Sequence, residues 1–345
     1  MASISWSADV EEEQVSEPPG PPMAVFSVVG AGRSGTTVLA SILGEVDGFQ
    51  SAGELRWFWE RGIAEQRPCG CGKIPERCPV WSVVASRVSE AQAGRGWSLP
   101  EIVAAQHEVA RRRSLFRLLR ALDRGVGGWQ ALDLVLKVTG NTVRAYADVT
   151  GARVIVDTSK RPQDAAVLAM LNHVEHYVLH IVRDPRAVVH SWRRRKSFSS
   201  ESGSRTMGTR SLPASVRAWL FNSIGAELLR RRLPESRWLH MRYEDFAANP
   251  RSSVDSILRF LGEGSAVTPF TSDDTVTLHP NHIVAGNPSR FTTGSVQIRA
   301  DEEWRNTLPR HDQRLVEWLT KPLMVRYGYG GSSNAQDMQS PRTAR

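Results

Sequence analysis

The feature that most constrains the fold is a repeated unit in which a short apolar stretch is followed by a polar turn and a helical pattern. The first unit is VFSVVGAGRSGTTVLASIL, residues 25–43. Three more units begin with apolar stretches at residues 154–156, 177–182 and 238–241, and the last of them continues into a helix after Pro250. Short apolar strands that alternate with helices predict a parallel sheet covered by helices on both faces. The sequence therefore predicts an α/β fold.

The remaining segments indicate how the chain is organised around this sheet. Residues 1–22 are acidic and proline-rich and residues 331–345 are polar, so we expect a disordered leader and a disordered tail. We expect residues 23–330 to form a single α/β domain. Residues 60–150, most of which have a helical pattern, are expected to be an insertion that forms a cap or a wall of the substrate site.

Polar residues follow three of the predicted strands at the points where these strands end. They are residues 30–37, 157–160 and 183–186. Ligands of parallel sheets gather beyond the carboxyl ends of the strands. We therefore expect these three segments to lie close together and to form a binding site.

The segment GAGRSGTT, residues 30–37, resembles a nucleotide-binding P-loop that lacks the lysine. Gly30 and Gly35 have the P-loop spacing, but Thr36 occupies the lysine position and a cation comes earlier, as Arg33. Glycines let backbone N–H groups converge on a tetrahedral anion at the N-terminus of the next helix. The segment therefore predicts an anion-binding loop rather than a plain turn.

A magnesium-dependent kinase or NTPase is the first alternative. Such an enzyme needs the P-loop lysine and an acid on a later strand that binds magnesium. Asp157 follows an apolar strand and could provide the acid, but the lysine is missing. The residues favour a different anionic ligand, and this class stays an alternative.

The formal net charge of +8 favours an anionic ligand or partner. No aromatic–basic RNA motif and no zinc-finger spacing is present, so we expect no nucleic-acid partner. A non-catalytic protein that binds anions or nucleic acid stays the second alternative. No apolar run reaches the ~18 residues of a membrane span. The N-terminus lacks the order of a signal peptide, and we expect a cytoplasmic protein.

Four segments, in order along the chain, resemble the sulfotransferase family. They are GAGRSGTT, IVRDPRAVVHSW, RYEDFAANP with ILRFLG, and GNPSRFTTG with DEEWRN. The resemblance runs from about residue 25 to residue 327, is weakest in the insertion, and is closest in style to bacterial and tyrosylprotein-type members. It implies a P-loop-like fold and a metal-free, in-line transfer of a sulfuryl group from 3′-phosphoadenosine-5′-phosphosulfate (PAPS) to a hydroxyl, which leaves adenosine-3′,5′-bisphosphate. The acceptor is an unidentified small molecule, peptide or glycan.

The resemblance also implies which residues bind PAPS. The residues for the 5′-phosphosulfate come from the loop and are Arg33, Ser34, Gly35, Thr36 and Thr37. The residues for the 3′-phosphate come from later segments and are Arg183, Ser191 and Arg290. Phosphate suits the second group, because an arginine fork can bind it in two places and a serine adds a hydroxyl. From the residues alone, an ion pair of Arg183 with Asp184 and a solvated Ser191 are equally good interpretations.

Three residues are predicted to be catalytic on the same basis. Glu54 corresponds to the base of tyrosylprotein-type members, which takes the proton of the acceptor. Arg33 and Lys160 correspond to cations that stabilise charge on the sulfuryl group and on the leaving oxygen. The alternatives are a surface Glu54 paired with Arg56 and a surface Lys160. The adjacent aromatics 57–59 could line the acceptor pocket, with at least one of them in the core.

The three cysteines of the chain lie together in CGCGKIPERCPVW, at Cys69, Cys71 and Cys78. An odd number without a signal peptide argues against a disulfide scaffold. Three thiols so close together could bind a metal, but the pattern C-x-C-x6-C has no obvious fourth ligand. We predict a compact Gly- and Pro-rich turn with partly buried thiols and no metal ligand, and the role of the cysteines stays open.

Overall fold

The structure is a computed structural model of the chain. It describes residues 23–91, 97–194, 197–200, 203–206 and 208–329. The predicted leader, residues 1–22, and the predicted tail, residues 331–345, lie outside the described residues.

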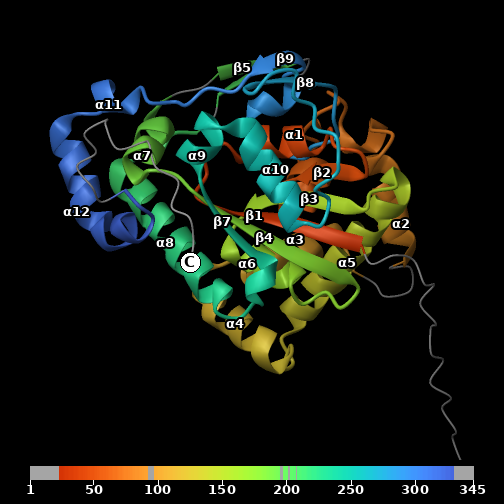
Figure 1. Ribbon diagram of the computed structural model, residues 1–345. Helices are drawn as coiled ribbons and strands as arrows, with labels where there is room; N and C mark the ends of the chain where they lie inside the picture. The colour runs from red at the N-terminus through yellow and green to blue at the C-terminus, as the bar shows by residue number, and fades with distance from the viewer. Residues whose placement is uncertain (1–22, 92–96, 195–196, 201–202, 207, 330–345) are drawn as a thin grey trace, which may run out of the picture.

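The centre of the fold is a sheet of five parallel strands in the order β2-β3-β1-β4-β7 (Figure 1). The strands are β1 (Met23–Gly30), β2 (Phe49–Gly53), β3 (Val154–Lys160), β4 (Val174–Val182) and β7 (Trp238–Arg242). All four predicted strands are present, and the predicted parallel α/β fold is confirmed. Because the strands are parallel, the segments that follow them emerge at one edge of the sheet.

Two strands differ from the sequence prediction. β2 was not predicted, because FQSAG contains one large apolar residue, Phe49, and no apolar run. β3 continues to Lys160, whereas the sequence predicted a polar loop from Asp157 onward. The extension follows from the position of β3 between β2 and β1: Asp157 pairs with Gly53 on one side and with Ser27 on the other.

Successive side chains of β1 pack on opposite faces of the sheet, as the pleat requires. Phe26 and Val28 pack on one face with α1 (Thr36–Leu43), α9 (Tyr243–Ala248) and α10 (Pro250–Phe260). On the other face, Val25 packs with α2 (Trp81–Ala91) and α5 (Gln130–Thr150), and Val29 with α6 (Pro162–Leu168) and α8 (Leu212–Arg230). In Figure 1, α1 and α10 lie above the sheet and α5 and α6 lie below it. Each fully buried side chain of this size contributes ~1.5–3 kcal/mol by leaving water.

Within the predicted insertion, residues 60–150, the segment between residues 80 and 147 is largely helical. It contains α2, α3 (Leu99–Val109), α4 (Leu115–Arg124) and most of α5. Trp81 and Tyr146 of this segment are fully buried, stack on each other, and belong to the same apolar cluster as Ile155 of β3. The insertion therefore forms one layer of the core, in addition to any role as a wall of the site.

The remaining elements surround the sheet. The helices are α7 (Pro185–Arg193), α11 (Trp304–Thr307) and α12 (Arg310–Arg326), and two hairpins are formed by β5 (Ser197–Ser200) with β6 (Gly203–Thr206) and by β8 (Thr275–Leu278) with β9 (Gly294–Gln297). Short helical turns occupy Leu55–Trp57, Phe58–Ala64, Pro75–Arg77, Arg112–Ser114, Glu235–Arg237 and Pro288–Phe291. No helix in the described part of the chain is both long enough and apolar enough to cross a membrane.

Candidate active site

The glycine-rich segment forms a tight loop between β1 and α1. Gly35 is the N-cap of α1 and has φ +72°, and a Cβ at this position would lie 2.8 Å from the ring of Tyr243, so only glycine fits. Among the described residues, no side chain caps this helix end. The first N–H groups of a helix have no partner within the helix. The N-terminus of α1 can therefore receive an anion, as the sequence predicted.

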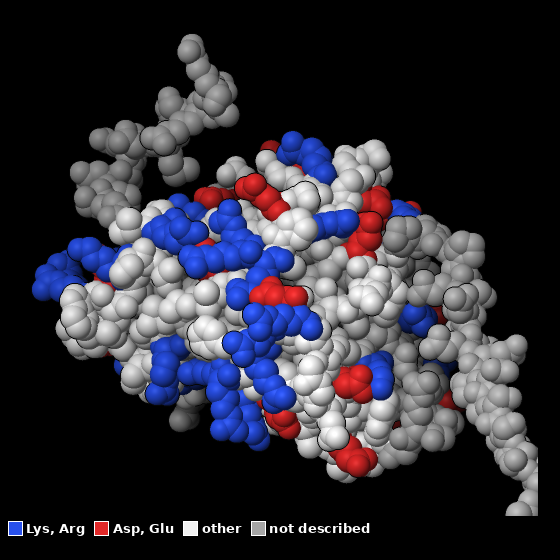
Figure 2. All heavy atoms as spheres, turned by 90° about the horizontal axis from the view of Figure 1, so that it is seen from below, with Lys and Arg blue, Asp and Glu red and all other residues white. Residues whose placement is uncertain are grey.

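A cleft of about 600 Å³ opens at the carboxyl edge of the sheet, where the loop after β1, the end of β3 and the helix α7 contribute to its lining. Two carboxylates line it, Glu54 and Asp301. Its cationic lining residues are more numerous: Arg33, Arg61, Arg112, Lys160, Arg161, Arg183 and Arg210. Lysine and arginine also form a dense band across the face of the molecule seen in Figure 2. Such a cleft attracts an anionic ligand.

Arg33 lies among other cations at the mouth of the loop. Its guanidinium is 4.6 Å from the ring centre of Trp192, and the guanidinium of Arg210 is 3.9 Å from the same ring. Burial and the neighbouring charge of Arg210 both lower the pKa of Arg33. Repulsion between these guanidinium groups would be relieved by an anion bound in the cleft.

Glu54 and Lys160 form a pair inside the cleft. The Nζ of Lys160 donates a hydrogen bond to Glu54 Oε1 and a second, of 3.0 Å, to the carbonyl of Thr158. Arg61 Nη1 lies 3.8 Å from the other carboxylate oxygen. The two side chains are only 12% and 14% exposed, so neither is a surface residue. The alternative pairing with Arg56 is wrong, because Arg56 pairs with Asp164, Nε to Oδ1 at 3.5 Å.

The turn that carries Glu54 is held in place by hydrogen bonds that the sequence did not predict. The N–H of Glu54 donates to the carbonyl of Val284 at 2.9 Å. Oδ1 of Asp157 accepts from the N–H of Leu55 at 3.1 Å and from the hydroxyl of Ser159 at 2.6 Å. Asp157 is buried, and burial raises the pKa of its carboxyl to about 7. This carboxylate therefore positions the turn after β2 and lies behind the cleft.

Arg183 and Ser191 both line the cleft. Arg183 donates to the carbonyls of Arg33 and Asp301, each at 2.7 Å, and its guanidinium lies 4.4 Å from the ring centre of Tyr243. The alternative of a local pair with Asp184 is wrong, since Asp184 pairs with Arg186 at 2.7 Å. Ser191 is buried, so the alternative of a solvated residue on α7 is wrong as well.

Comparison with known proteins finds a similarity to one enzyme family. Residues 146–265 match the model of the sulfotransferase family, and this stretch includes Lys160, Arg183 and Ser191. Over this stretch the chain is similar to the sulfotransferase family. The resemblance found in the sequence is confirmed, and the family is one of PAPS-dependent enzymes. No curated protein matches the chain significantly.

Several solved structures resemble the chain at low identity. The sulfotransferase domain of the curacin biosynthetic pathway is 15% identical, with 87% of this chain and 98% of that chain covered and a TM-score of 0.44. Sulfotransferase STF9 of Mycobacterium avium is 14% identical, with 89% and 77% covered and a TM-score of 0.43. Retinol dehydratase in complex with androsterone and the inactive cofactor PAP is 15% identical, with 94% and 84% covered and a TM-score of 0.38.

Two of the predicted PAPS ligands do not line the cleft with their side chains. Ser34 is fully buried, and neither it nor Arg290 is among the described residues that line the cleft. The guanidinium of Arg290 donates to the carbonyls of Pro68 at 3.2 Å and Gly286 at 3.3 Å, and burial lowers its pKa to about 10. Direct contact of either side chain with PAPS stays a prediction.

The three adjacent aromatics divide between the cleft and the core. Phe58 and Trp59 are buried, which confirms that at least one is a core residue. Trp57 lines the cleft, and the guanidinium groups of Arg56 and Arg61 lie 3.9 Å and 3.7 Å from the centre of its ring. The cleft thus has one partly exposed aromatic ring, that of Trp57, close to Glu54 in the sequence.

Proposed function

We propose that the chain transfers a sulfuryl group from PAPS to a hydroxyl group of an acceptor. One observation carries the proposal: Arg33, Glu54, Lys160 and Arg183, which are far apart in the sequence, line one cationic cleft with the N-terminus of α1. Every part that such a transfer needs is then present at one place: an anion site, cations near the transferred group, and a carboxylate base.

The residues present fit the charges of PAPS. The uncapped N-terminus of α1, with the hydroxyls of Thr36 and Thr37 in the cleft lining, suits the 5′-phosphosulfate. We assign the 3′-phosphate to Arg183 and Ser191, since both line the same cleft, from the turn after β4 and from α7. When bound, PAPS supplies a sulfuryl group whose bond to the phosphate oxygen breaks as a bond to the acceptor oxygen forms, leaving adenosine-3′,5′-bisphosphate.

Three side chains of the protein act on this exchange. Glu54 takes the proton of the acceptor hydroxyl, and its hydrogen bond to Lys160 keeps the carboxylate in one orientation. Lys160 and Arg33 place positive charge where negative charge develops. Because both cations are fixed by the fold before the substrates bind, the stabilisation needs little reorganisation.

A kinase or NTPase is the weaker candidate. Its magnesium-binding acid would have to be Asp157, the acid on the strand after the loop. That carboxyl accepts hydrogen bonds from the turn at Leu55 and from Ser159, and it is not among the described residues that line the cleft. A pure anion-binding protein is weaker too, since the carboxylate of Glu54 in the cleft would only reduce its affinity for anions.

The acceptor site is proposed to lie around Trp57. Trp192, Phe221 and Tyr243 also line the cleft, so its described lining has four aromatic side chains among its cations. The insertion contributes three residues to the cleft lining: Arg61, from the helical turn Phe58–Ala64, and Ala110 and Arg112, which follow α3. A hydroxyl carried by a small molecule, a peptide or a glycan fits this description, and screening pooled acceptors with labelled PAPS would identify the class. A cytoplasmic location stays a prediction.

Calorimetric titration with adenosine-3′,5′-bisphosphate and with ADP tests the proposal. We expect the bisphosphate to bind about tenfold or more tightly than ADP, because ADP lacks the 3′-phosphate that Arg183 and Ser191 would hold. Arg183→Ala should remove most of this preference. Arg251→Ala, which alters a surface pair with Asp273, is the matched control and should bind like the wild type. Tighter binding of ADP would favour the kinase or NTPase and overturn the proposal.

A further inference from the structure

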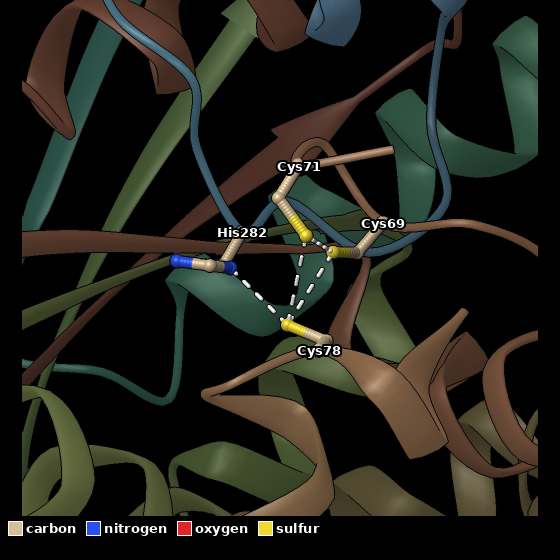
Figure 3. Close-up of side chains that lie close together, drawn as sticks. All are labelled: Cys69, Cys71, Cys78 and His282. Carbon is tan, nitrogen blue, oxygen red and sulfur yellow. Dashed lines mark hydrogen bonds between the residues drawn. The ribbon is translucent and has the colours of Figure 1, made fainter. Parts of the chain in front are cut away.

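The three cysteines meet a fourth metal-binding side chain that the sequence did not reveal. Cys69, Cys71 and Cys78 lie on the turns after Phe58–Ala64 and around Pro75–Arg77, and His282 lies between β8 and β9. The ligand atoms of all four side chains lie within 4.8 Å of one another (Figure 3). The sequence prediction of no metal ligand rested on the missing fourth side chain. That side chain is 204 residues beyond Cys78.

The distances within the cluster resemble the edges of a zinc tetrahedron. With Zn–S bonds of about 2.3 Å and a Zn–N bond of about 2.1 Å, tetrahedral geometry places sulfur atoms about 3.8 Å apart and sulfur about 3.6 Å from nitrogen. Sγ of Cys78 lies 3.6 Å from Cys69, 3.8 Å from Cys71 and 3.2 Å from Nδ1 of His282. The Cys69–Cys71 separation of 2.9 Å is shorter than the edge, and Cys71 is the less buried of the two.

We propose that Cys69, Cys71, Cys78 and His282 bind one zinc ion in a closed structural site. Three thiolates with one imidazole are a common set for structural zinc, and all four positions would be filled by the protein. None of the four is among the described residues that line the cleft, so the ion takes no part in the proposed transfer. A disulfide would use only two of the three thiols. It would also not account for the short distance of 3.2 Å between Sγ of Cys78 and Nδ1 of His282.

The surrounding backbone holds the two ligand segments together. Trp81 Nε1 donates to the carbonyl of His282 at 2.6 Å, and the N–H of Gly70 donates to the carbonyl of Ile283 at 2.9 Å. A Cβ on Gly70 would lie 1.8 Å from Oδ1 of Asn281, so this close approach requires glycine. Such outer contacts orient ligands before the metal binds.

The ion would connect the start of the insertion to the segment that supports the active site. Two residues after His282, the carbonyl of Val284 accepts the N–H of Glu54. One residue before Cys69, the carbonyl of Pro68 accepts from Arg290. Zinc would therefore stabilise the turn that carries the proposed base, from outside the cleft.

Metal analysis of the full chain, purified under reducing conditions, tests the proposal. We expect about one zinc ion per chain in the wild type, and in His282→Ala and Cys78→Ser less than about a tenth of that content. His279→Ala is the matched control, because this nearby histidine is exposed and pairs with Glu45; it should keep its zinc. Removal of the metal should also lower the unfolding temperature of the wild type, and zinc should restore it.

A second measurement keeps the test decisive if the ligand variants fail to fold. Cobalt added to the metal-free wild type should produce the absorption of tetrahedral thiolate coordination, and one equivalent of zinc should abolish it. A wild-type chain that holds neither zinc nor tetrahedral cobalt would overturn the proposal. So would mass analysis that finds a native disulfide among the three cysteines. Binding of adenosine-3′,5′-bisphosphate, measured separately, reports on the donor site and not on the metal.

Discussion

Arg33 and Lys160 share an unusual backbone conformation. Their φ angles are +77° and +73°, in the left-handed region that residues other than glycine seldom adopt. A residue held there costs on the order of 1 kcal/mol or more, and such strain persists only where the surrounding structure imposes it. Both residues stand at the ends of neighbouring strands and line the cleft. The strain therefore agrees with a functional demand on where these two cations are placed.

Glu54→Gln should separate binding from catalysis. Glutamine keeps the shape of the side chain but cannot take the proton of the acceptor, so we expect the turnover of labelled PAPS to fall by about 10²–10⁴-fold. Affinity for adenosine-3′,5′-bisphosphate should change little, because the base faces the acceptor. Glu65→Gln is the control, since Glu65 is a half-exposed partner of Arg67 on the same segment. Undiminished turnover in Glu54→Gln would show that another group is the base.

At the scale of elements, the active site depends on how far β2 and β3 extend. β2 ends at Gly53, and Glu54 follows it directly; β3 ends at Lys160. Because the two strands pair in parallel, their carboxyl ends bring the acid and the amine together. Asp157 then connects the strands, through the N–H of Leu55. The proposed catalytic pair is thus a product of strand register.

Asp157→Asn should alter how stability depends on pH. Burial raises the pKa of Asp157 to about 7, above the ordinary value of 3.8. An acid with a raised pKa in the folded state stabilises the protein fully below its unfolded pKa, and this contribution is lost as the pH rises through about 7. Asparagine retains an acceptor for Leu55 and Ser159 but does not ionise. Relative to the wild type, the variant should therefore gain on the order of 1–3 kcal/mol in unfolding free energy between about pH 5.5 and pH 8.

Urea denaturation at both pH values measures this difference. Asp148→Asn is the control, because Asp148 is an exposed partner of Arg87 on α5 and its loss should leave the pH dependence unchanged. Parallel pH profiles of unfolding free energy for Asp157→Asn and the wild type would mean that burial does not raise the pKa of the Asp157 carboxyl.

At the scale of the whole molecule, charge is concentrated where the strands end. The formal net charge is +8, and seven lysine and arginine residues line the cleft against two carboxylates. Like charges held this close destabilise the empty cleft and favour a small, multiply charged anion. The net positive charge of the sequence thus becomes informative about the ligand once the structure shows that the cations line one cleft.

Salt should weaken the binding of adenosine-3′,5′-bisphosphate. Raising the salt from about 0.05 M to 0.3 M shortens the screening length by more than half, so we expect affinity to fall several-fold. Calorimetry at both salt concentrations measures the effect. A single-stranded oligonucleotide without a free 3′-phosphate should compete poorly. If it displaces the bisphosphate at equal concentration, the nucleic-acid-binding alternative is favoured instead.

The sequence by itself determined the features that short stretches encode. The alternation of apolar strands with helices predicted the parallel sheet, because the period of apolar residues is a local property. The loop at Arg33 and Gly35 predicted an anion site in the same way, since its glycines and hydroxyls are adjacent in the chain. The turn from Arg183 to Pro185 was equally visible. The parallel sheet, the loop before α1 and the turn before α7 are found where the sequence placed them, and anion binding at the loop stays a prediction.

Only the tertiary structure decided which distant residues meet. β2 has no apolar run that would predict it from the sequence. Glu54 reaches Lys160 because β2 pairs with β3. His282 joins the cysteines, and Arg290 turns from the cleft to the carbonyl of Pro68, because the segment between β8 and β9 packs against the insertion. These contacts join residues more than a hundred positions apart. No local pattern encodes such contacts, because they depend on the register of strands and on packing across the whole chain.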